Sequence, residues 1–455
     1  MFEYIDKLKK DTNNISDIIY RKKKIKNKDV YIIFNEPLTS GDRISDSIFE
    51  SLYEIDFNKN IKEEIINNIY NCKITTTNNY DEMCYYLHNG FTIIIIENIP
   101  DILVLETRSN DKRGIAIPTS ENTLRGPKDS FVEDYQTNMG LIKKRIRDNN
   151  LWVKDAVVGT YSKTKISIIY LHGKCDESIV DDIYKKLESA NIDSILNSGA
   201  IKSIVGESNI NPLPTIMSTE RPDRVARALI RGKICILVDN DPYVLILPAT
   251  LNDFFKTTED YYGKNINTTL TRIIRFISFY IALFTPALYI ALITYNQEML
   301  PEDFLVNFAI QRSSVPFPAF FEAFMMLIAF EILRESDLRN SGFAGSSLSI
   351  VGALILGEAA VSAGIVSPIM IIVTALTAIA SLPFNEYELI NGLRWYRIIF
   401  MIGASLFGII GILFTFIYFV INICDTNLYG KSYLTPFIPT NIKRLKDSIV
   451  RINPR

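Results

Sequence analysis

Two long uncharged stretches in the second half of the chain constrain the fold most. Residues 276–295 and 398–420 contain no charged side chain, and each is about as long as a helix that crosses a ~30 Å hydrocarbon core. The 455 residues hold 49 basic and 51 acidic side chains, but about 28% of residues 1–275 are charged against about 13% of residues 276–455. This split predicts a soluble region followed by an α-helical, multi-pass membrane domain.

The first half alternates β-rich runs with helical patterns, which predicts an α/β region made of two small subdomains. We expect hairpins around Asn98 and Asn240 and a helix capped by Asp176. Further strands are predicted at 30–34, 165–171 and 191–195, and helices at 43–54, 62–70, 129–147 and 222–231. The predicted organisation is a polar lead-in at 1–28, subdomains at 29–135 and 136–262, a membrane domain at 270–424 and a basic tail at 425–455.

Cysteine and histidine usage argues against several classes of site. The five cysteines are scattered without a C-x-x-C pair, and the two histidines, His88 and His172, lie far apart. This predicts neither a disulfide framework nor a metal site, and each histidine is expected to be a surface or packing residue. No glycine-rich phosphate motif is present. We therefore expect no catalytic residues, no cofactor and no enzymatic activity.

Balanced charge gives no electrostatic case for nucleic acid as a partner. The first residues lack the apolar core of a cleavable signal peptide, so the N-terminal region is expected in the cytoplasm. Lys264, Arg272 and Arg275 precede the first span, and the C-terminal tail is basic. By the positive-inside rule both flanks are predicted to be cytoplasmic.

Two cytoplasmic ends require an even number of crossings, yet we count five apolar segments. One of them should therefore be re-entrant, interfacial or buried in an oligomer. Residues 304–333 are the best candidate because they contain Pro316, Pro318 and two glutamates. We interpret Pro316, Pro318 and Pro368 as structural turns. Small residues four apart, such as Ala404 and Gly408, predict close packing of membrane helices.

Three carboxylates fall within the apolar segments: Glu322, Glu331 and Glu358. A charge at the bilayer centre costs at least ~2.5–3.5 kcal/mol, so each should face protein or water. One interpretation is a structural ion pair, for example Glu331 or Glu335 with Arg334 or Arg312. The other is a polar cavity or ion path, which we weigh equally for Glu358. We predict Glu322 and Glu331 as buried membrane carboxylates.

Four segments resemble one known family. Residues 123–147 (TLRGPKDSFVEDYQTNMGLIKKRIR) and 221–248 (RPDRVARALIRGKICILVDNDPYVLILP) are similar to signature runs of the A subunits of GerA-type spore germinant receptors. So are residues 312–336 and 348–381 in the apolar half. The loop 336–346 lacks the Gly-[Ile/Val]-Arg-Leu-Pro run that the family pattern leads us to expect. The resemblance covers roughly residues 30–440, and its motifs are long and specific.

The resemblance implies a membrane subunit that turns nutrient binding into ion release across the spore inner membrane. Such A subunits work with a permease-like B subunit that holds the nutrient and with a lipid-anchored C subunit. They are thought to form a homo-oligomer around an ion path, which fits helices rich in small residues. We hypothesise that residues 352–367 line this path and that an apolar constriction gates it by dewetting. The candidate path or gate residues are Ile350, Leu354, Glu358, Val361, Ser362 and Ile365.

Arg125, Gly126 and Pro127 are predicted to form a structural turn that links the subdomains, not an anion site. Three other functions stay open. The chain could be the paralogue encoded with the SpoVA proteins, which would amplify germination without its own nutrient, and gene context would separate the two. It could be a secondary transporter, for which inverted repeats would be expected, or a membrane-anchored enzyme.

Overall fold

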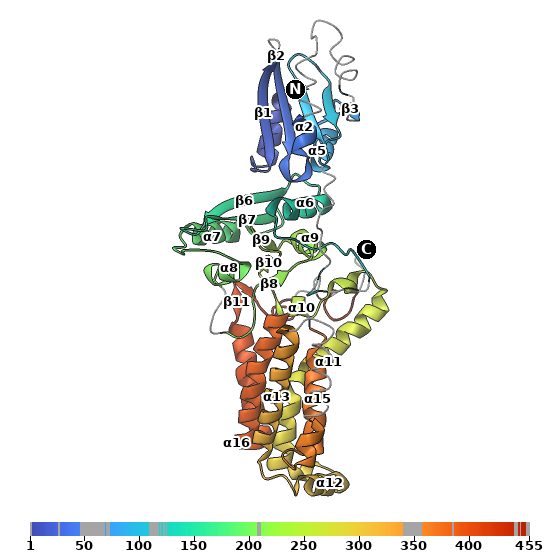
Figure 1. Ribbon diagram of the computed structural model, residues 1–455, viewed down its shortest axis with the longest axis vertical. Coiled ribbons are helices and arrows are strands. Elements are labelled where there is room, and N and C mark those ends of the chain that lie inside the picture. The colour runs from blue at the N-terminus through green and yellow to red at the C-terminus, as the bar shows by residue number, and fades with distance from the viewer. Residues whose placement is uncertain are drawn as a thin grey trace. The chain divides into compact units, whose positions relative to one another are not determined.

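The structure, a computed structural model, divides the chain into two compact units (Figure 1). One comprises residues 1–208 and 216–248, and the other residues 209–215 and 249–455. They are called unit 1 and unit 2. The described residues are 2–25, 28–45, 69, 73–108, 118, 120–121, 123, 125–206, 211–339, 357–384, 386–440, 445 and 447–451.

The first sheet of unit 1 has five antiparallel strands in the order β1-β2-β4-β5-β3. They are β1 (Ile18–Ile25), β2 (Lys28–Asn35), β3 (Ile74–Thr77), β4 (Thr92–Ile96) and β5 (Ile102–Leu105), accompanied by α1 (Phe2–Asp11), η1 (Glu36–Leu38), α2 (Gly41–Ile44) and α5 (Tyr80–His88). Alternate residues of the central strands, including Val30, Ile32, Ile94 and Ile96, form one buried apolar cluster. The period of two places them on one face, and Ile93 and Ile95 on the opposite face are also buried, so both faces of the central strands are covered.

The second sheet follows the same plan, in the order β6-β7-β9-β10-β8. Its elements are α6 (Tyr135–Arg145), β6 (Leu151–Val158), β7 (Thr164–Leu171), α7 (Glu177–Glu188), α8 (Ser198–Ile204), β8 (Met217–Thr219), α9 (Pro222–Ile230), β9 (Ile234–Val238) and β10 (Val244–Leu247). The α/β class and both hairpins are therefore confirmed, as is Asp176 as the N-cap of α7.

The two sheets are copies of one topology. Gly90 and Gly232 precede β4 and β9 with φ of 82° and 78°, and Asn98 and Asn240 turn the following hairpins with φ of 62° and 63°. All four residues adopt the left-handed region that glycine and asparagine tolerate best. The interval from Gly90 to Asn98 equals the interval from Gly232 to Asn240. The sequence analysis did not detect this repeat, although Gly90, Asn98 and Pro100 have the same residue types as Gly232, Asn240 and Pro242.

Several local expectations for unit 1 were wrong. Residues 18–25 of the predicted lead-in form β1, since Ile18 and the residues after it pair with β2. The helix predicted from residue 129 begins at Tyr135, because the Asp134 carboxylate accepts the Thr137 N–H at 2.6 Å and caps it there. Residues 191–195 form no strand. The helices predicted at 43–54 and 62–70 lie mostly outside the described residues.

Unit 2 is a helical bundle, seen in yellow to red in Figure 1. Its elements are α10 (Leu251–Phe254), η3 (Thr258–Tyr261), α11 (Asn265–Thr294), η4 (Gln297–Met299), α12 (Glu302–Arg312), α13 (Ala319–Arg339), α15 (Pro368–Ser381), α16 (Tyr387–Asp425), β11 (Asn427–Leu428) and β12 (Lys431–Ser432). Residues 357–362 are also helical. Among the described residues, α11 and α16 are long and apolar enough to cross a membrane.

The helix α16 is not one continuous span, as the uncharged run 398–420 suggested. Gly408 has φ 61° and ψ −137°, and the chain reverses there. The Tyr396 and Phe419 rings lie 4.7 Å apart, and the Asn422 amide donates to the Tyr396 hydroxyl at 2.8 Å. A straight helix would separate these residues by about 1.5 Å per residue. Residues 387–407 and 409–425 are therefore two antiparallel helices.

Glycines allow this tight reversal. A Cβ on Gly411 would overlap the carbonyl of Gly403, and a Cβ on Gly408 would lie 2.6 Å from the Asn296 Oδ1 atom. The same Asn296 oxygen accepts the Ile409 N–H at 3.1 Å and so caps the second helix. Ala404 is fully buried, whereas the predicted role of Gly408 is corrected. Gly408 makes the turn, and Gly403 with Gly411 makes the close contact.

Buried ion pairs hold the start of α11. Asp260 lies 2.9 Å from both Arg272 and Arg275, and Arg272 also pairs with Asp447 at 2.9 Å. The Arg451 guanidinium donates to the carbonyl of Gly263 at 3.0 Å. The arginines that sequence analysis counted as topology signals are thus buried partners of Asp260 and of the C-terminal segment. The beginning of α11 and residues 447–451 lie at the same end of unit 2.

Candidate functional site

Among the described carboxylates of the apolar half, Glu322 is the most deeply buried, with no exposed surface. It lies in the first turn of α13. Its Oε1 atom accepts the backbone N–H and the hydroxyl of Ser367, both at 2.5 Å. Ser367 is the N-cap of α15. A carboxylate at this position is stabilised by the positive end of the helix dipole and by free N–H groups.

Two further helices reach this junction. The Nε atom of Arg312, the last residue of α12, lies 3.8 Å from Glu322 Oε2. The Tyr289 hydroxyl of α11 lies 3.4 Å from Ser367 Oγ. One carboxylate thus links α12, α13 and α15 and, through Ser367, α11. Pro368 is the first residue of α15, a position that proline favours. The polar junction therefore forms at the N-terminus of α15.

The candidate path residues lie just before Ser367. Glu358, Ser362 and Ile365 are exposed, and Val361 is half-buried. Gly364 turns the chain with φ 69°. Ile350 and Leu354 lie outside the described residues. Of the predicted prolines, Pro316 and Pro318 are exposed between α12 and α13.

Glu331 has a different partner from those expected. Its Oε2 atom lies 2.7 Å from Arg394 Nη2 on α16, and both side chains are partly exposed. Sequence analysis had suggested Arg334 or Arg312 for this pair. Glu331 pairs with Arg394 because unit 2 packs α13 against the first half of α16.

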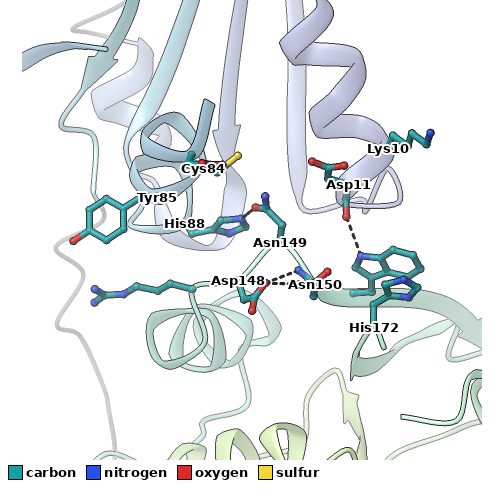
Figure 2. A pocket seen from close by; sticks show the side chains of 12 residues that line it. Lys10, Asp11, Cys84, Tyr85, His88, Asp148, Asn149, Asn150 and His172 are labelled. Carbon is teal, nitrogen blue, oxygen red and sulfur yellow. Dashed lines mark hydrogen bonds between the residues drawn. The ribbon is translucent and has the colours of Figure 1, made fainter. Parts of the chain in front are cut away.

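Unit 1 contains a polar pocket of about 620 Å³ between its two halves (Figure 2). Residues from α1, α5, the segment between α6 and β6, the start of β6 and the end of β7 line it: Lys10, Asp11, Asp81, Cys84, Tyr85, His88, Arg147, Asp148, Asn149, Asn150, Trp152 and His172. Trp152 stacks on His172 at 3.9 Å and donates its indole N–H to the Asp11 carbonyl at 3.2 Å. Carboxylates, cations and an aromatic wall together suit a small polar molecule that carries both charges.

The two histidines differ in this pocket. His88 is buried and directed at the Asn149 side chain, with which it forms a hydrogen bond (Figure 2). Burial lowers the pKa of His88 to about 4, although the Asn149 hydrogen bond opposes this shift. His172 is more exposed and pairs with Glu177 at 2.5 Å. His88 is thus a packing residue that stays neutral at physiological pH.

Arg221 is a key residue that sequence analysis missed. It is only 1% exposed and pairs with Asp223 at 3.1 Å. Its Nη atoms donate to the carbonyls of Glu121 and Pro127 at 3.2 and 2.9 Å and to the Thr123 hydroxyl at 3.0 Å. One guanidinium therefore binds the first signature segment of the chain to the second.

The neighbouring Glu220 reinforces the same contact. Its Oε1 atom accepts the N–H groups of Ser120 and Glu121 at 2.6 and 3.0 Å. Arg125 and Gly126 form an exposed bend beside it, in which Gly126 has φ 127°. The available sequence signal was the E-R-P-D-R run, in which two acidic and two basic residues flank a proline.

Lys143 lies in the last turn of α6 but does not face solvent. It is buried and pairs with Asp17 at 2.9 Å. It donates to Asn35 Oδ1 at 3.2 Å. Burial lowers the pKa of Lys143, and the Asp17 carboxylate partly opposes this shift. The pair connects α6 to the residues that flank the first sheet.

No cluster of three or more His, Cys, Asp or Glu side chains that could hold a metal ion occurs in the part of the chain that the structure describes. The polar features found are the Glu322 junction, the Glu331–Arg394 pair, the unit 1 pocket and the Arg221 clamp. They position helices and loops and could bind small polar groups.

Known proteins resemble the chain over nearly its whole length. The profile described as "Bacillus/Clostridium GerA spore germination protein" matches residues 6–454. Spore germination protein KA of Bacillus subtilis (strain 168) is 36% identical over 454 residues, which cover 98% of this chain and 84% of that protein. Spore germination protein GerQA of Bacillus cereus is 33% identical, over 93% of this chain and 83% of that protein.

Two further relatives complete the comparison. The uncharacterized membrane protein YfkQ of Bacillus subtilis (strain 168) is 32% identical, over 99% of this chain and 88% of that protein. The crystal structure of the N-terminal domain of the A subunit of the Bacillus megaterium spore germinant receptor GerK3 is 28% identical, with a TM-score of 0.43. It covers 54% of this chain and 94% of that one. From the profile and the near full-length relatives, we conclude that this chain belongs to the GerA family of spore germination proteins.

Proposed function

We propose that this chain is the A-type membrane subunit of a spore germinant receptor and that it converts nutrient binding into ion release across the spore inner membrane. In this proposal several copies surround a gated ion path, and a permease-like B subunit and a lipid-anchored C subunit complete the receptor. The observation that carries the proposal is the buried Glu322 junction at the start of α15. It fixes the end of the segment for which we propose the path.

Gating requires two arrangements of the helices and a ligand that prefers one of them. The junction supplies a suitable element, because one carboxylate holds Ser367, and Ser367 ends the candidate path segment. Movement of α13 would therefore move the end of that segment. Val361 and Ile365, with Ile350 and Leu354, are proposed to form the apolar constriction.

The reversal at Gly408 bears on the number of crossings. If both halves of α16 span the membrane, the five apolar segments become six. An even number then follows without a re-entrant segment at 304–333. The contacts of Asp447 and Arg451 with the beginning of α11 agree with a shared side for these two ends. We propose that this side is cytoplasmic.

The decisive test is the early release of monovalent ions from spores with and without the gene, across a panel of nutrients. We expect release to be lost for one class of nutrient and normal for the others. A uniform slowing for every nutrient would instead indicate an amplifying paralogue, and normal release throughout would contradict a role in this step.

The gate is tested separately with Val361→Ala. Removal of two methyl groups from an apolar constriction should favour its wetting, so the variant is expected to raise resting ion permeability without nutrient. Val420→Ala, a partly exposed valine in the second half of α16, is the matched control and should behave like the parent protein. Unchanged permeability and an unchanged nutrient response in Val361→Ala would place the constriction elsewhere.

A further inference from the structure

We propose that unit 2 holds a site for the phosphate of an anionic membrane lipid, in a cavity between α13 and the first half of α16. The cavity has a volume of about 410 Å³. Phe324, Leu327 and Ile328 form its apolar side, and Glu331, Arg394 and Arg397 its polar side. None of these residues belongs to the Glu322 junction or to the candidate path.

Positive charge exceeds negative charge at the polar side. Arg394 pairs with Glu331 at 2.7 Å, but its buried Nε atom has no hydrogen-bond acceptor among the described residues. Arg397 is 5% exposed and, within the described chain, makes one hydrogen bond, from Nε to the Ala282 carbonyl at 2.7 Å. Arg334 lies close enough to interact with both. Three guanidinium groups thus lie within electrostatic range of the Glu331 carboxylate, and Arg394 is the one shown in contact with it.

An excess of positive charge is unfavourable inside a bilayer unless a bound anion neutralises it. Arginine suits phosphate best, because its planar fork can donate two parallel hydrogen bonds to two oxygens. Basic pockets between membrane helices near the cytoplasmic surface are typical sites for lipid headgroups. The chemistry therefore favours a phosphate monoanion or diester over a neutral ligand.

The depth and the walls of the cavity favour a lipid over free phosphate. Ala282 lies six residues into the uncharged stretch of α11 that begins at Phe276, which is about 9 Å at 1.5 Å per residue. Trp395, which also lines the cavity, is 63% exposed, and Ile328 is 44% exposed. An indole on the flank is typical of the membrane interface. Acyl chains can cover this apolar flank while the headgroup reaches the arginines.

The test uses the purified full-length protein in nanodiscs of phosphatidylcholine alone, or of equal parts phosphatidylcholine and phosphatidylglycerol. Native mass spectrometry measures bound phosphatidylglycerol, and a thermal scan measures the unfolding midpoint. We expect retained phosphatidylglycerol and a higher midpoint in the mixed discs. Inorganic phosphate added to phosphatidylcholine discs should not raise the midpoint, and an equal rise would overturn the assignment to a lipid.

Two kinds of variant separate charge from folding. Arg397→Gln and Arg394→Gln should each weaken phosphatidylglycerol retention about fivefold, the effect of one basic residue at an anionic surface. Ile328→Trp keeps every charge but fills the cavity, and it should also lose the lipid. Arg312→Gln, at the Glu322 junction, is the control and should retain it.

Unchanged retention in both Arg397→Gln and Ile328→Trp would refute the site. If these variants instead altered self-association in detergent and left retention intact, a second protein chain would occupy the cavity and the lipid proposal would be wrong. The inference rests on membrane insertion of unit 2. A protein that stays soluble without detergent or lipid would disprove that insertion before any lipid is compared.

Discussion

At the scale of single residues, buried charges join segments of this protein that lie far apart in the sequence. Arg221, Lys143 and Asp260 are each less than 4% exposed, and each has an oppositely charged partner within 3.1 Å. Removal of one member of such a pair leaves an uncompensated charge, which is strongly destabilising. These residues are therefore where single substitutions should have the largest effects.

Arg221→Ala should destabilise unit 1 by about 3–5 kcal/mol, because it removes the buried ion pair with Asp223 and the donors to the carbonyls of Glu121 and Pro127. Arg221→Lys keeps the positive charge but not the planar guanidinium with its several donors. It should therefore lower the free energy of unfolding by less than Arg221→Ala does. Urea unfolding of the full-length protein in detergent can measure this through Trp152, with Trp395→Phe removing the second reporter. Arg21→Ala, at an exposed site on β1, is the control, and equal losses in both would refute the clamp.

His88 predicts a pH dependence. Its pKa is about 4 in the folded protein and about 6.5 in an unfolded chain, so the unfolded state binds the extra proton between these values. Stability should therefore be full above pH 6.5 and fall as the pH drops, by at most about 3 kcal/mol. Urea unfolding followed by Trp152 fluorescence at several pH values between 5 and 7 would measure this slope of the free energy of unfolding.

His88→Gln supplies the matched variant, since its amide can still donate to Asn149 but does not titrate. The slope should flatten in this variant and persist in His172→Gln. A slope that survives His88→Gln would assign the pH dependence to another group.

At the scale of elements, reversals and caps decide where the apolar helices begin and end. The helix α15 begins at Ser367 and Pro368, and the Glu322 carboxylate accepts a hydrogen bond from Ser367 at this N-terminus. Asn296 caps the helix that follows Gly408. Hydropathy registers none of these, because it counts apolar residues and not backbone conformation. For this reason residues 398–420 had the composition of one span although they form a hairpin.

Gly408→Ala tests the hairpin. The substituted residue would need a positive φ and would place its Cβ 2.6 Å from the Asn296 oxygen and 2.7 Å from the Tyr295 side chain, so we expect loss of well over 1 kcal/mol. Gly430→Ala has φ 69° but meets nothing within 4 Å and should lose only about 1 kcal/mol. Thermal unfolding followed by Trp395 compares them, and similar midpoints would argue against the reversal.

At the scale of the whole molecule, unit 1 is built from two copies of one antiparallel sheet, and unit 2 is a bundle closed by its own C-terminal segment. Burial opposes ionisation of Asp260, but the hydrogen bonds and charges of Arg275 and Arg272 outweigh it and lower the pKa of this carboxyl. Its stabilising contribution is therefore present above about pH 4, the usual carboxyl value, and is lost as the pH falls through the lower folded value.

Asp260→Asn should release residues 447–451 and destabilise unit 2 by about 3–5 kcal/mol, because Arg275 loses its counter-charge and Arg272 keeps only that of Asp447. Hydrogen exchange of peptides from the beginning of α11 and from the C-terminal segment would report this release. Asp303→Asn, at an exposed position on α12, should leave the exchange of both peptides unchanged. Protection that is unaffected in Asp260→Asn would show that the network is dispensable.

The sequence by itself determined the class of each half, the hairpins at Asn98 and Asn240, the cap at Asp176, and the family. These features depend on periodicity, on residues that tolerate a left-handed backbone and on side chains that bond their own segment, all of which are local. Only the tertiary structure decided that Arg221 joins residues 121–127, that Glu331 pairs with Arg394 and that α16 folds back. Each of these depends on which distant segments become neighbours, and a buried charge or a glycine without a Cβ takes its role from the neighbour it meets.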